Sequence, residues 1–341
     1  MLKTYIHKVV EGFDLTEEEA EEAMSVIMAG EATDAQLACL LTALRMKGEK
    51  ASEIAGFARA MAKQAKRVDC RVDNLVDTCG TGGDGAGTFN ISTTAAFISA
   101  GCGLVVAKHG NRSVSGQCGS ADVLEALGVR IDLSPHNAAI CIKEVGLGFM
   151  FAPYFHKSMK HAVRPRREMA IRTIFNLLGP LTNPAGTRRQ LIGVYREDLT
   201  DTLGDVLLML GMKHAWVVHG LDGLDELSVC AKTRVVEVKD GVKTAFTLDP
   251  EQLGVKVASK GSLKGGGAQD NASILVSILK GKEKGPMRDA ALLNAAAALV
   301  VGGLAEDIRA GFHLAARSVE NGRALAVLEK LRAPAREAKT G

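Results

Sequence analysis

One run of nineteen residues, 76–94, constrains the fold more than any other part of the chain. It reads Val-Asp-Thr-Cys-Gly-Thr-Gly-Gly-Asp-Gly-Ala-Gly-Thr-Phe-Asn-Ile-Ser-Thr-Thr. This order predicts the end of a strand, a glycine-rich loop and the hydroxyl-rich first turn of a helix. Glycines without a Cβ let backbone N–H groups approach an anion, and a helix N-terminus favours negative charge. We therefore expect this segment to bind phosphate.

Two common phosphate motifs do not fit the glycine run. No Gly-Lys-Ser/Thr closes it as in a P-loop, and no acidic residue stands at the offset of a dinucleotide fingerprint. A glycine-rich loop can also be only a tight turn, so that alternative stays open at this point. Asp84 would repel a phosphate unless its carboxylate contacts sugar hydroxyls or a bridging cation. The combination favours a phosphorylated sugar.

A second polar segment follows the next predicted strand, residues 104–108. Lys108 and Arg112 can bind phosphate oxygens, and Asn111 can both donate and accept hydrogen bonds. Ligands of open parallel sheets bind beyond the carboxyl ends of the strands, so this loop and the glycine loop should line one crevice. The alternative is an ordinary solvated loop.

A pair of adjacent acids, Asp225 and Glu226, follows the strand predicted at 214–219. Mg²⁺ prefers hard oxygen ligands and is usually bound by one or two carboxylates together with the phosphates of a substrate. The pair therefore offers a magnesium site, although most such pairs are exposed loop acids.

Composition favours a two-domain enzyme, because 341 residues exceed what one core normally supports. A net charge of +3 and 4% aromatic residues give no basic field or stacking platform for nucleic acid. There is no apolar run of the roughly 20 residues that a membrane helix needs, and the first residues lack the pattern of a signal peptide. Seven cysteines without Cys-x-x-Cys spacing indicate a reducing, cytoplasmic environment.

The chain before about residue 72 carries helix signals only. Capping boxes at Thr16-x-x-Glu19 and Thr33-x-x-Gln36 and an apolar stripe over 54–61 predict three helices. Beyond it, strands near 75–79, 104–108, 147–151, 190–195 and 214–219 alternate with helical patterns. This alternation predicts an α/β fold with a mainly parallel central sheet flanked by helices, plus the small all-helical domain. Asp240-Gly241, between 234–238 and 242–248, predicts an antiparallel hairpin.

Five segments, in chain order, resemble the anthranilate phosphoribosyltransferase family, and the resemblance covers nearly the whole chain. They are Gly80–Asp84 with Thr88–Thr93, Lys108–Ser113, Gly119–Glu125, Arg172–Asn176 with Gly179–Pro184, and Asp222–Glu226. The resemblance implies the architecture shared by that family and the nucleoside phosphorylases. It also implies a helical domain of residues 1–72, completed by helices near 164–185, that forms a homodimer. An α/β domain of residues 73–163 and 186–341 would bind phosphoribosyl pyrophosphate.

The resemblance also implies site residues, carried over by position. Contacts to phosphoribosyl pyrophosphate fall on Gly80, Thr81, Gly82, Gly83, Asp84, Thr88, Asn90, Ser92, Thr93, Lys108 and Ser120. Contacts to anthranilate fall on Gly80, His109, Asn111 and Arg166, with Arg164 and Arg167 as alternatives to Arg166. Magnesium falls on Ser92, Asp225 and Glu226.

The implied reaction joins the amine of anthranilate to the ribose of phosphoribosyl pyrophosphate, the second step of tryptophan synthesis from chorismate. An aromatic amine is neutral near pH 7, so positioning and stabilisation of the leaving group suffice, and His109 is either a general base or, as we favour, a donor that shapes the pocket. Two alternatives remain. One is a pyrimidine nucleoside phosphorylase, against which the acid pair and the Lys108 segment argue, and the other is a catalytically silent relative that binds nucleic acid.

Overall fold

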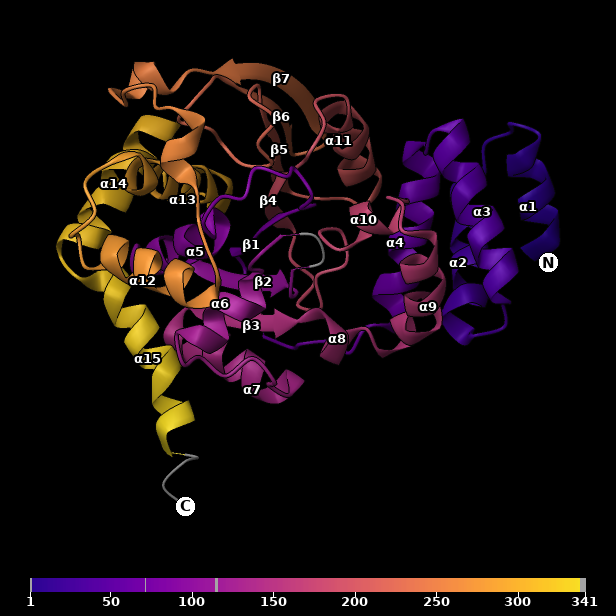
Figure 1. Cartoon of the computed structure of the whole chain (residues 1–341), viewed down its shortest axis with the longest axis horizontal. Coiled ribbons are helices and arrows are strands. Elements are labelled where there is room, and N and C mark those ends of the chain that lie inside the picture. Colours follow the sequence, from indigo (N-terminus) through magenta and orange to yellow (C-terminus); the bar gives the residue numbers. More distant parts are fainter. Residues whose placement is uncertain (1, 71, 114–115, 338–341) are drawn as a thin grey trace.

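The computed structural model describes residues 2–70, 72–113 and 116–337. Val114 and Ser115, the last residues of the predicted second polar loop, lie outside the described residues. A seven-stranded sheet occupies the middle of the molecule, with a helical bundle on one side and the C-terminal helices on the other (Figure 1). No helix in the described part of the chain is long and apolar enough to cross a membrane.

The N-terminal bundle contains one more helix than the sequence predicted. Its helices are α1 (Leu2–Val10), α2 (Glu17–Ala29), α3 (Asp34–Lys47) and α4 (Ala51–Gln64). Both predicted capping boxes form, because Thr16 and Thr33 each accept from the backbone N–H three residues on. The prediction of three helices was wrong because α1 has only nine residues and no acid in its first turn. Its apolar side chains, Leu2, Tyr5 and Val9, are nevertheless buried.

Two later helices join the bundle. They are α9 (Lys160–Met169), which packs on α3 and α2, and α10 (Phe175–Leu178), which packs on α4. Ala162, Ile174 and Phe175 are buried in the same apolar cluster as the cores of α2, α3 and α4. The chain therefore returns to the bundle after its first three strands, and residues 179–188 then lead back to the sheet.

Five predicted strands are confirmed to within two residues at most of their ends. They are β1 (Leu75–Gly80), β2 (Val105–Gly110), β3 (Leu147–Phe151), β4 (Arg189–Gly193) and β5 (His214–Gly220), and they pair in parallel with one another. Strand β5 also pairs antiparallel with β6. The predicted hairpin is β6 (Thr233–Lys239) and β7 (Val242–Leu248), antiparallel, with left-handed φ values of 48° at Asp240 and 83° at Gly241. Positive φ at both central residues is typical of a type I′ hairpin turn.

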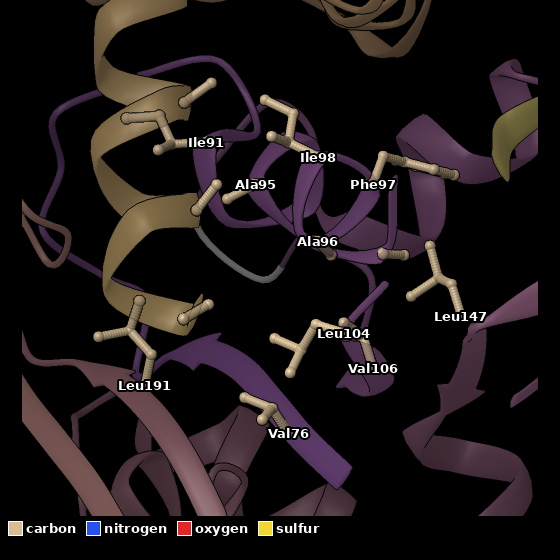
Figure 2. Packing of buried hydrophobic residues seen from close by; sticks show 14 of the residues in the cluster. Val76, Ile91, Ala95, Ala96, Phe97, Ile98, Leu104, Val106, Leu147 and Leu191 are labelled. Carbon is tan, nitrogen blue, oxygen red and sulfur yellow. The ribbon is translucent and has the colours of Figure 1, made fainter. Parts of the chain in front are cut away.

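The remaining helices flank the sheet. They are α5 (Ile91–Gly101), α6 (Ser120–Ala126), α7 (Pro135–Ile140), α8 (Ala152–Phe155), α11 (Leu199–Met209), α12 (Ala268–Leu279), α13 (Pro286–Gly302), α14 (Ile308–Glu320) and α15 (Arg323–Glu337). Helices α5 and α13 cover one face of β1, β2 and β4, and Figure 2 shows Val76, Leu104 and Val106 lying between the sheet and α5. Alternate side chains of the strands, such as Ile192, point to the other face, toward α11 and the bundle. The fold is therefore the predicted α/β class with a helical bundle attached.

The strand order β3-β2-β1-β4-β5-β6-β7 creates a switch point between β1 and β4. From β1 the chain moves outward in one direction to β2 and β3, and it then returns to place β4 on the other side of β1. Connections at a switch point diverge and leave a crevice beyond the carboxyl ends of the strands. Strands β1, β2, β4 and β5 all end in glycine, at Gly80, Gly110, Gly193 and Gly220, so loops can approach these ends closely.

Candidate active site

The acid pair lies directly over the switch point. Asp225 Oδ2 accepts a hydrogen bond of 2.8 Å from the backbone N–H of Gly82. A Cβ on Gly80 would lie 2.5 Å from the same oxygen, and a Cβ on Gly193 would lie 1.6 Å from the Asp225 carbonyl oxygen. Glycine is therefore required at the ends of β1 and β4, because otherwise the loop that carries Asp225 and Glu226 could not reach the glycine loop.

Glu226 occupies the N-terminus of α5. Its Oε1 accepts a hydrogen bond of 3.2 Å from the backbone N–H of Ser92, in the first turn of the helix. Orphan N–H groups and the helix dipole favour an anion at this point. The glycine loop and the helix start thus receive carboxylate oxygens at the two positions where the sequence predicted phosphate.

A third carboxylate, Asp84, completes an acidic cluster. Its Oδ2 accepts from the backbone N–H of Asp225 at 3.5 Å, and its Oδ1 accepts from Ala86 at 3.1 Å. Burial, together with the neighbouring Asp84, raises the pKa of Asp225 to about 7. Burial, together with the neighbouring Asp225, raises the pKa of Glu226 to about 8. All three side chains are half-buried, and carboxylates that repel one another in such a place favour a proton or a metal cation among them.

Lys108 faces the same place from β2. Its side chain is buried, and Nζ donates to the carbonyl oxygen of Thr78 and, at 3.3 Å, to Ser92 Oγ. This cation lowers the pKa of Glu226 and so partly offsets the burial of the acids. The crevice has an ammonium group and helix-terminal amides on one side and carboxylates on the other. This arrangement can bind an anion together with a cation.

The donor set fits a magnesium ion that a substrate helps to bind. Among the described residues, no group of three or more His, Cys, Asp or Glu side chains is arranged to hold a metal by itself. The oxygens of Asp225, Glu226 and Ser92 are hard ligands, as Mg²⁺ prefers, and phosphate oxygens and water commonly complete such a site. The arrangement therefore suits a metal that arrives with a phosphorylated ligand.

The rest of the glycine segment is held from several directions. Thr81 N–H donates to Gly193 O at 2.9 Å, and Thr88 forms an isolated antiparallel bridge with Lys264. Gly82 and Gly83 have φ values of 67° and 82°, a conformation that favours glycine.

Two polar side chains at the start of α5 differ in their hydrogen bonding. Asn90 Oδ1 accepts from Asn271 at 2.9 Å, and its amide donates to Cys118 O at 3.2 Å. Thr93 Oγ1 is buried and has no hydrogen-bond partner among the described residues. A buried hydroxyl without a partner at a helix start is suited to a bound oxyanion.

His109 lies beside this crevice, at the end of β2. Its Nδ1 is 3.1 Å from the carbonyl oxygen of Gly179, which can only accept, so Nδ1 carries the proton and Nε2 is an acceptor. Burial and the nearby His156 lower the pKa of His109 to about 3. The ring is therefore neutral near pH 7, and it donates to the Gly179 loop while Nε2 has no partner among the described residues.

Asn111 and Ser120 flank the entrance to α6. Ser120 Oγ donates to Asn111 O at 3.2 Å, and Asn111 Oδ1 accepts from the Arg112 N–H at 2.7 Å. Arg112 is not directed toward phosphate, because its guanidinium pairs with Asp122 at 2.9 Å and with Glu125. In this structure the acids of α6 therefore engage Arg112, and Lys108 is the buried cation near the acid pair.

Of three neighbouring arginines on α9, only Arg166 turns inward. Its guanidinium carbon lies 5.0 Å from the centre of the Phe175 ring, and burial lowers its pKa. It forms no ion pair within the described residues, whereas Arg164 pairs with Glu168 at 2.9 Å and is 73% exposed. Arg167 is exposed. A half-buried guanidinium without an acid is suited to a carboxylate ligand.

Two residues that hold the site together were missed by sequence reasoning. Gly193 gives the acidic loop its space, and Arg172 donates to Gly83 O while its guanidinium lies 4.4 Å from the centre of the Tyr195 ring. A glycine closing each central strand was a visible signal for the first. Arg172 belongs to a recognised motif, but nothing in the sequence paired it with the glycine loop.

Comparison with known proteins gives the family. The glycosyl transferase family models for the helical bundle domain and the a/b domain match residues 3–65 and 72–325. Among curated proteins, the anthranilate phosphoribosyltransferase of Moorella thermoacetica is 54% identical over 331 residues, which cover 97% of each chain.

Solved structures agree with these matches. The anthranilate phosphoribosyltransferase (TrpD) of Thermus thermophilus superposes with a TM-score of 0.93 at 43% identity and covers 97% of this chain and 99% of its own. The Saccharomyces cerevisiae enzyme, solved in complex with PRPP and Mg, gives 0.90 at 28% identity over 98% of both chains. The resemblance stated from the motifs is therefore confirmed, and the chain belongs to the anthranilate phosphoribosyltransferase family.

Proposed function

We propose that this enzyme transfers the 5-phosphoribosyl group from phosphoribosyl pyrophosphate to the amine of anthranilate. The products are N-(5′-phosphoribosyl)anthranilate and pyrophosphate, in the second step of tryptophan synthesis from chorismate. Family membership supports this assignment over nearly the full chain. The single observation that carries it is the acid pair facing the glycine loop and the N-terminus of α5 across the switch point.

We assign the donor substrate to the side of the crevice that holds the amides. Backbone N–H groups of the glycine loop, the hydroxyl of Thr93 and the ammonium of Lys108 bind the phosphates, and Asp84 lies where a ribose hydroxyl or a cation can be met. The assigned donor residues are Gly80, Thr81, Gly82, Gly83, Asp84, Thr88, Asn90, Ser92, Thr93, Lys108 and Ser120. The unpartnered Thr93 hydroxyl and the buried ammonium support this side.

We assign anthranilate to the side formed by Gly80, His109, Asn111 and Arg166. The ring of His109 is neutral, so it orients the acceptor and does not remove a proton from it. Arg166 supplies a guanidinium without an acid of its own for the carboxylate of anthranilate. Its stacking on Phe175 and the outward pairing of Arg164 support Arg166 as the arginine that binds this carboxylate.

Ser92, Asp225 and Glu226 would hold Mg²⁺ together with the diphosphate. When bound, the ion neutralises charge on the departing pyrophosphate. The raised pKa values of Asp225 and Glu226 support a cation here, because a second positive charge lets both carboxylates ionise.

The chain's own residues act by position and charge. The C1′–O bond to pyrophosphate breaks as the amine nitrogen forms the C1′–N bond, and the ammonium that results loses its proton to water. Lys108 and the amides of the glycine loop stabilise the leaving oxygens. Holding two substrates in reactive geometry lowers the barrier by up to ~7–11 kcal/mol. No general base is required, because an aromatic amine is already neutral near pH 7.

The proposal is tested by following anthranilate fluorescence. We expect the signal to fall only when the enzyme, Mg²⁺ and phosphoribosyl pyrophosphate are all present. A signal that persists in the complete mixture would contradict the reaction. Phosphorolysis of uridine or thymidine by the same preparation would instead favour the pyrimidine nucleoside phosphorylase alternative.

We also propose a homodimer formed through the bundle of residues 1–72 with the helices near 164–185, and we assign residues 73–163 and 186–341 to the α/β domain that binds phosphoribosyl pyrophosphate. Large apolar side chains on this bundle are exposed, which supports the assignment: Val10 on α1 is 61% exposed, Met46 on α3 is 83% exposed and Val163 on α9 is 56% exposed. Light scattering should give twice the chain mass, and Met46→Glu should lower the measured mass.

Because all seven cysteines are free, we place the enzyme in the cytoplasm.

A further inference from the structure

A buried carboxylate behind the active site is used by no step described above. Asp77 lies in the middle of β1, and its side chain is 0% exposed. Its Oδ1 accepts from the backbone N–H of His109 at 3.2 Å, and its Oδ2 accepts from the amides of Asn183 at 2.7 Å and Gln190 at 3.5 Å. A carboxylate that receives three N–H donors is a strong, directional junction.

These donors come from three separate parts of the chain. His109 ends β2, Gln190 lies in β4, and Asn183 belongs to the segment that returns from the bundle to the sheet. Asn183 also donates to Ala107 O at 2.8 Å, and the Gln190 amide donates to Pro180 O. Asp77 thus ties the loop of residues 179–184 to both strands that flank β1.

The same loop touches the acceptor side of the crevice. Gly179 O accepts the proton of His109 Nδ1 at 3.1 Å, so the loop fixes the orientation of that ring. Asp77 therefore holds His109 twice, directly through its backbone N–H and indirectly through the loop that binds its ring.

One side of this loop is not close-packed. A groove of about 700 Å³ lies behind it, between α2 and α4 of the bundle and the start of β4. Pro180, Leu181, Asn183 and Gln190 form part of its lining. Because one side of the loop faces this open volume, the buried hydrogen bonds to Asp77 constrain the loop on the side where it lacks close-packed neighbours.

We propose that Asp77 is a positioning residue for the acceptor substrate. It touches neither substrate, and it holds the 179–184 loop against His109, beside which anthranilate binds. The inference rests on the proposed function, because it assumes that the acceptor binds beside His109. It predicts that loss of the junction weakens the acceptor and spares the donor, whose contacts lie on the glycine loop and Lys108.

Asp77→Asn gives the sharpest test. An amide at this position can still accept from His109, but its NH₂ group then faces the amides of Asn183 and Gln190, which also donate. We expect the KM for anthranilate to rise about tenfold or more, while the KM for phosphoribosyl pyrophosphate stays within about twofold.

Asn183→Ala provides a second, milder variant, since Asn183 is only half-buried and Asp77 keeps its other donors. Ser318→Ala is the matched control: it removes one buried hydrogen bond, to Ile98 O at 3.2 Å, in the α/β core away from the crevice. The control should show unchanged KM values for both substrates.

Three outcomes would overturn the inference. They are unchanged KM values in a folded Asp77→Asn or Asn183→Ala variant, an equal rise in both KM values, and a rise in the Ser318→Ala control. If Asp77→Asn does not fold, Asn183→Ala decides. Turnover by the unmodified enzyme is measured first, so a wrong reaction assignment is distinguished from a wrong role for Asp77.

Discussion

The closest approach in the site gives the most quantitative prediction. An alanine at position 193 would place its Cβ 1.6 Å from the Asp225 carbonyl oxygen, whereas real Cβ contacts essentially never fall below 3.0 Å. The oxygen must therefore retreat by at least about 1.4 Å, because interiors are close-packed and cannot absorb the overlap. The strand itself is fixed, since Gly193 is paired with Gly80 on one side and with Val218 on the other. The acidic loop is the part that moves.

The shift of the Asp225 carbonyl oxygen allows the loss of catalytic rate to be estimated. A misplacement of about 1 Å in a catalytic constellation can cost ~10²-fold, which is about 2.7 kcal/mol of transition-state stabilisation. We expect Gly193→Ala to lower kcat/KM for phosphoribosyl pyrophosphate by at least ~100-fold and to raise the Mg²⁺ concentration needed for half-maximal rate. Overpacking costs about 1–3 kcal/mol of folding stability, which a domain with roughly 5–15 kcal/mol survives.

The assay is the loss of anthranilate fluorescence at varied donor and Mg²⁺ concentrations. Gly261→Ala is the matched control, because a Cβ there meets nothing within 4 Å and its backbone is not left-handed. If folded Gly193→Ala enzyme keeps kcat/KM within about threefold of the unmodified enzyme, the close approach of Asp225 does not matter for catalysis and the reasoning is refuted.

Three further predictions concern charge. Asp225→Asn with Glu226→Gln should make the metal-free protein more resistant to urea at pH 8 and should abolish Mg²⁺-dependent turnover. The two carboxyl groups lower the free energy of unfolding as the pH rises from their unfolded pKa values, 3.8 and 4.5, toward their folded values of about 7 and about 8. Unchanged turnover would show that they are ordinary loop acids. Arg166→Ala should raise the KM for anthranilate and not that for the donor, with Arg167→Ala as the control; the reverse pattern would reassign the arginine. His109→Asn should lower the rate without changing the shape of the pH–rate profile between about pH 5 and 8, because the histidine is neutral throughout that range. If the variant loses the fall in rate at low pH that the unmodified enzyme shows, His109 is a general base.

Much of the architecture follows from local sequence rules. The strands alternate with helical patterns, and β1, β2 and β4 carry apolar residues toward α5 and α13, so the parallel sheet was predictable. Capping boxes at Thr16 and Thr33 fixed the starts of two helices. Helix α1 was not predictable from such signals, because its stability comes from packing Leu2, Tyr5 and Val9 on the bundle.

The candidate site was predictable where residue type and strand ends coincide. The acids after β5 and the glycines after β1 meet because carboxyl ends of parallel strands share one edge of the sheet. Pairings between distant loops were not predictable: Arg112 binds the acids of α6, and Arg172 binds the glycine loop. Such choices depend on distances that only the folded chain sets.

We propose that a diphosphate and a divalent cation bind together between the glycine loop, the N-terminus of α5 and the acid pair. A crystal structure of the enzyme with phosphoribosyl pyrophosphate and Mn²⁺, with the metal located by anomalous scattering, tests it most directly. We expect one or more metal peaks within coordination distance of Asp225 or Glu226 and of the diphosphate, with the diphosphate on the amides of residues 80–93. A diphosphate bound elsewhere, or a metal with no ligand from the acid pair, would contradict it.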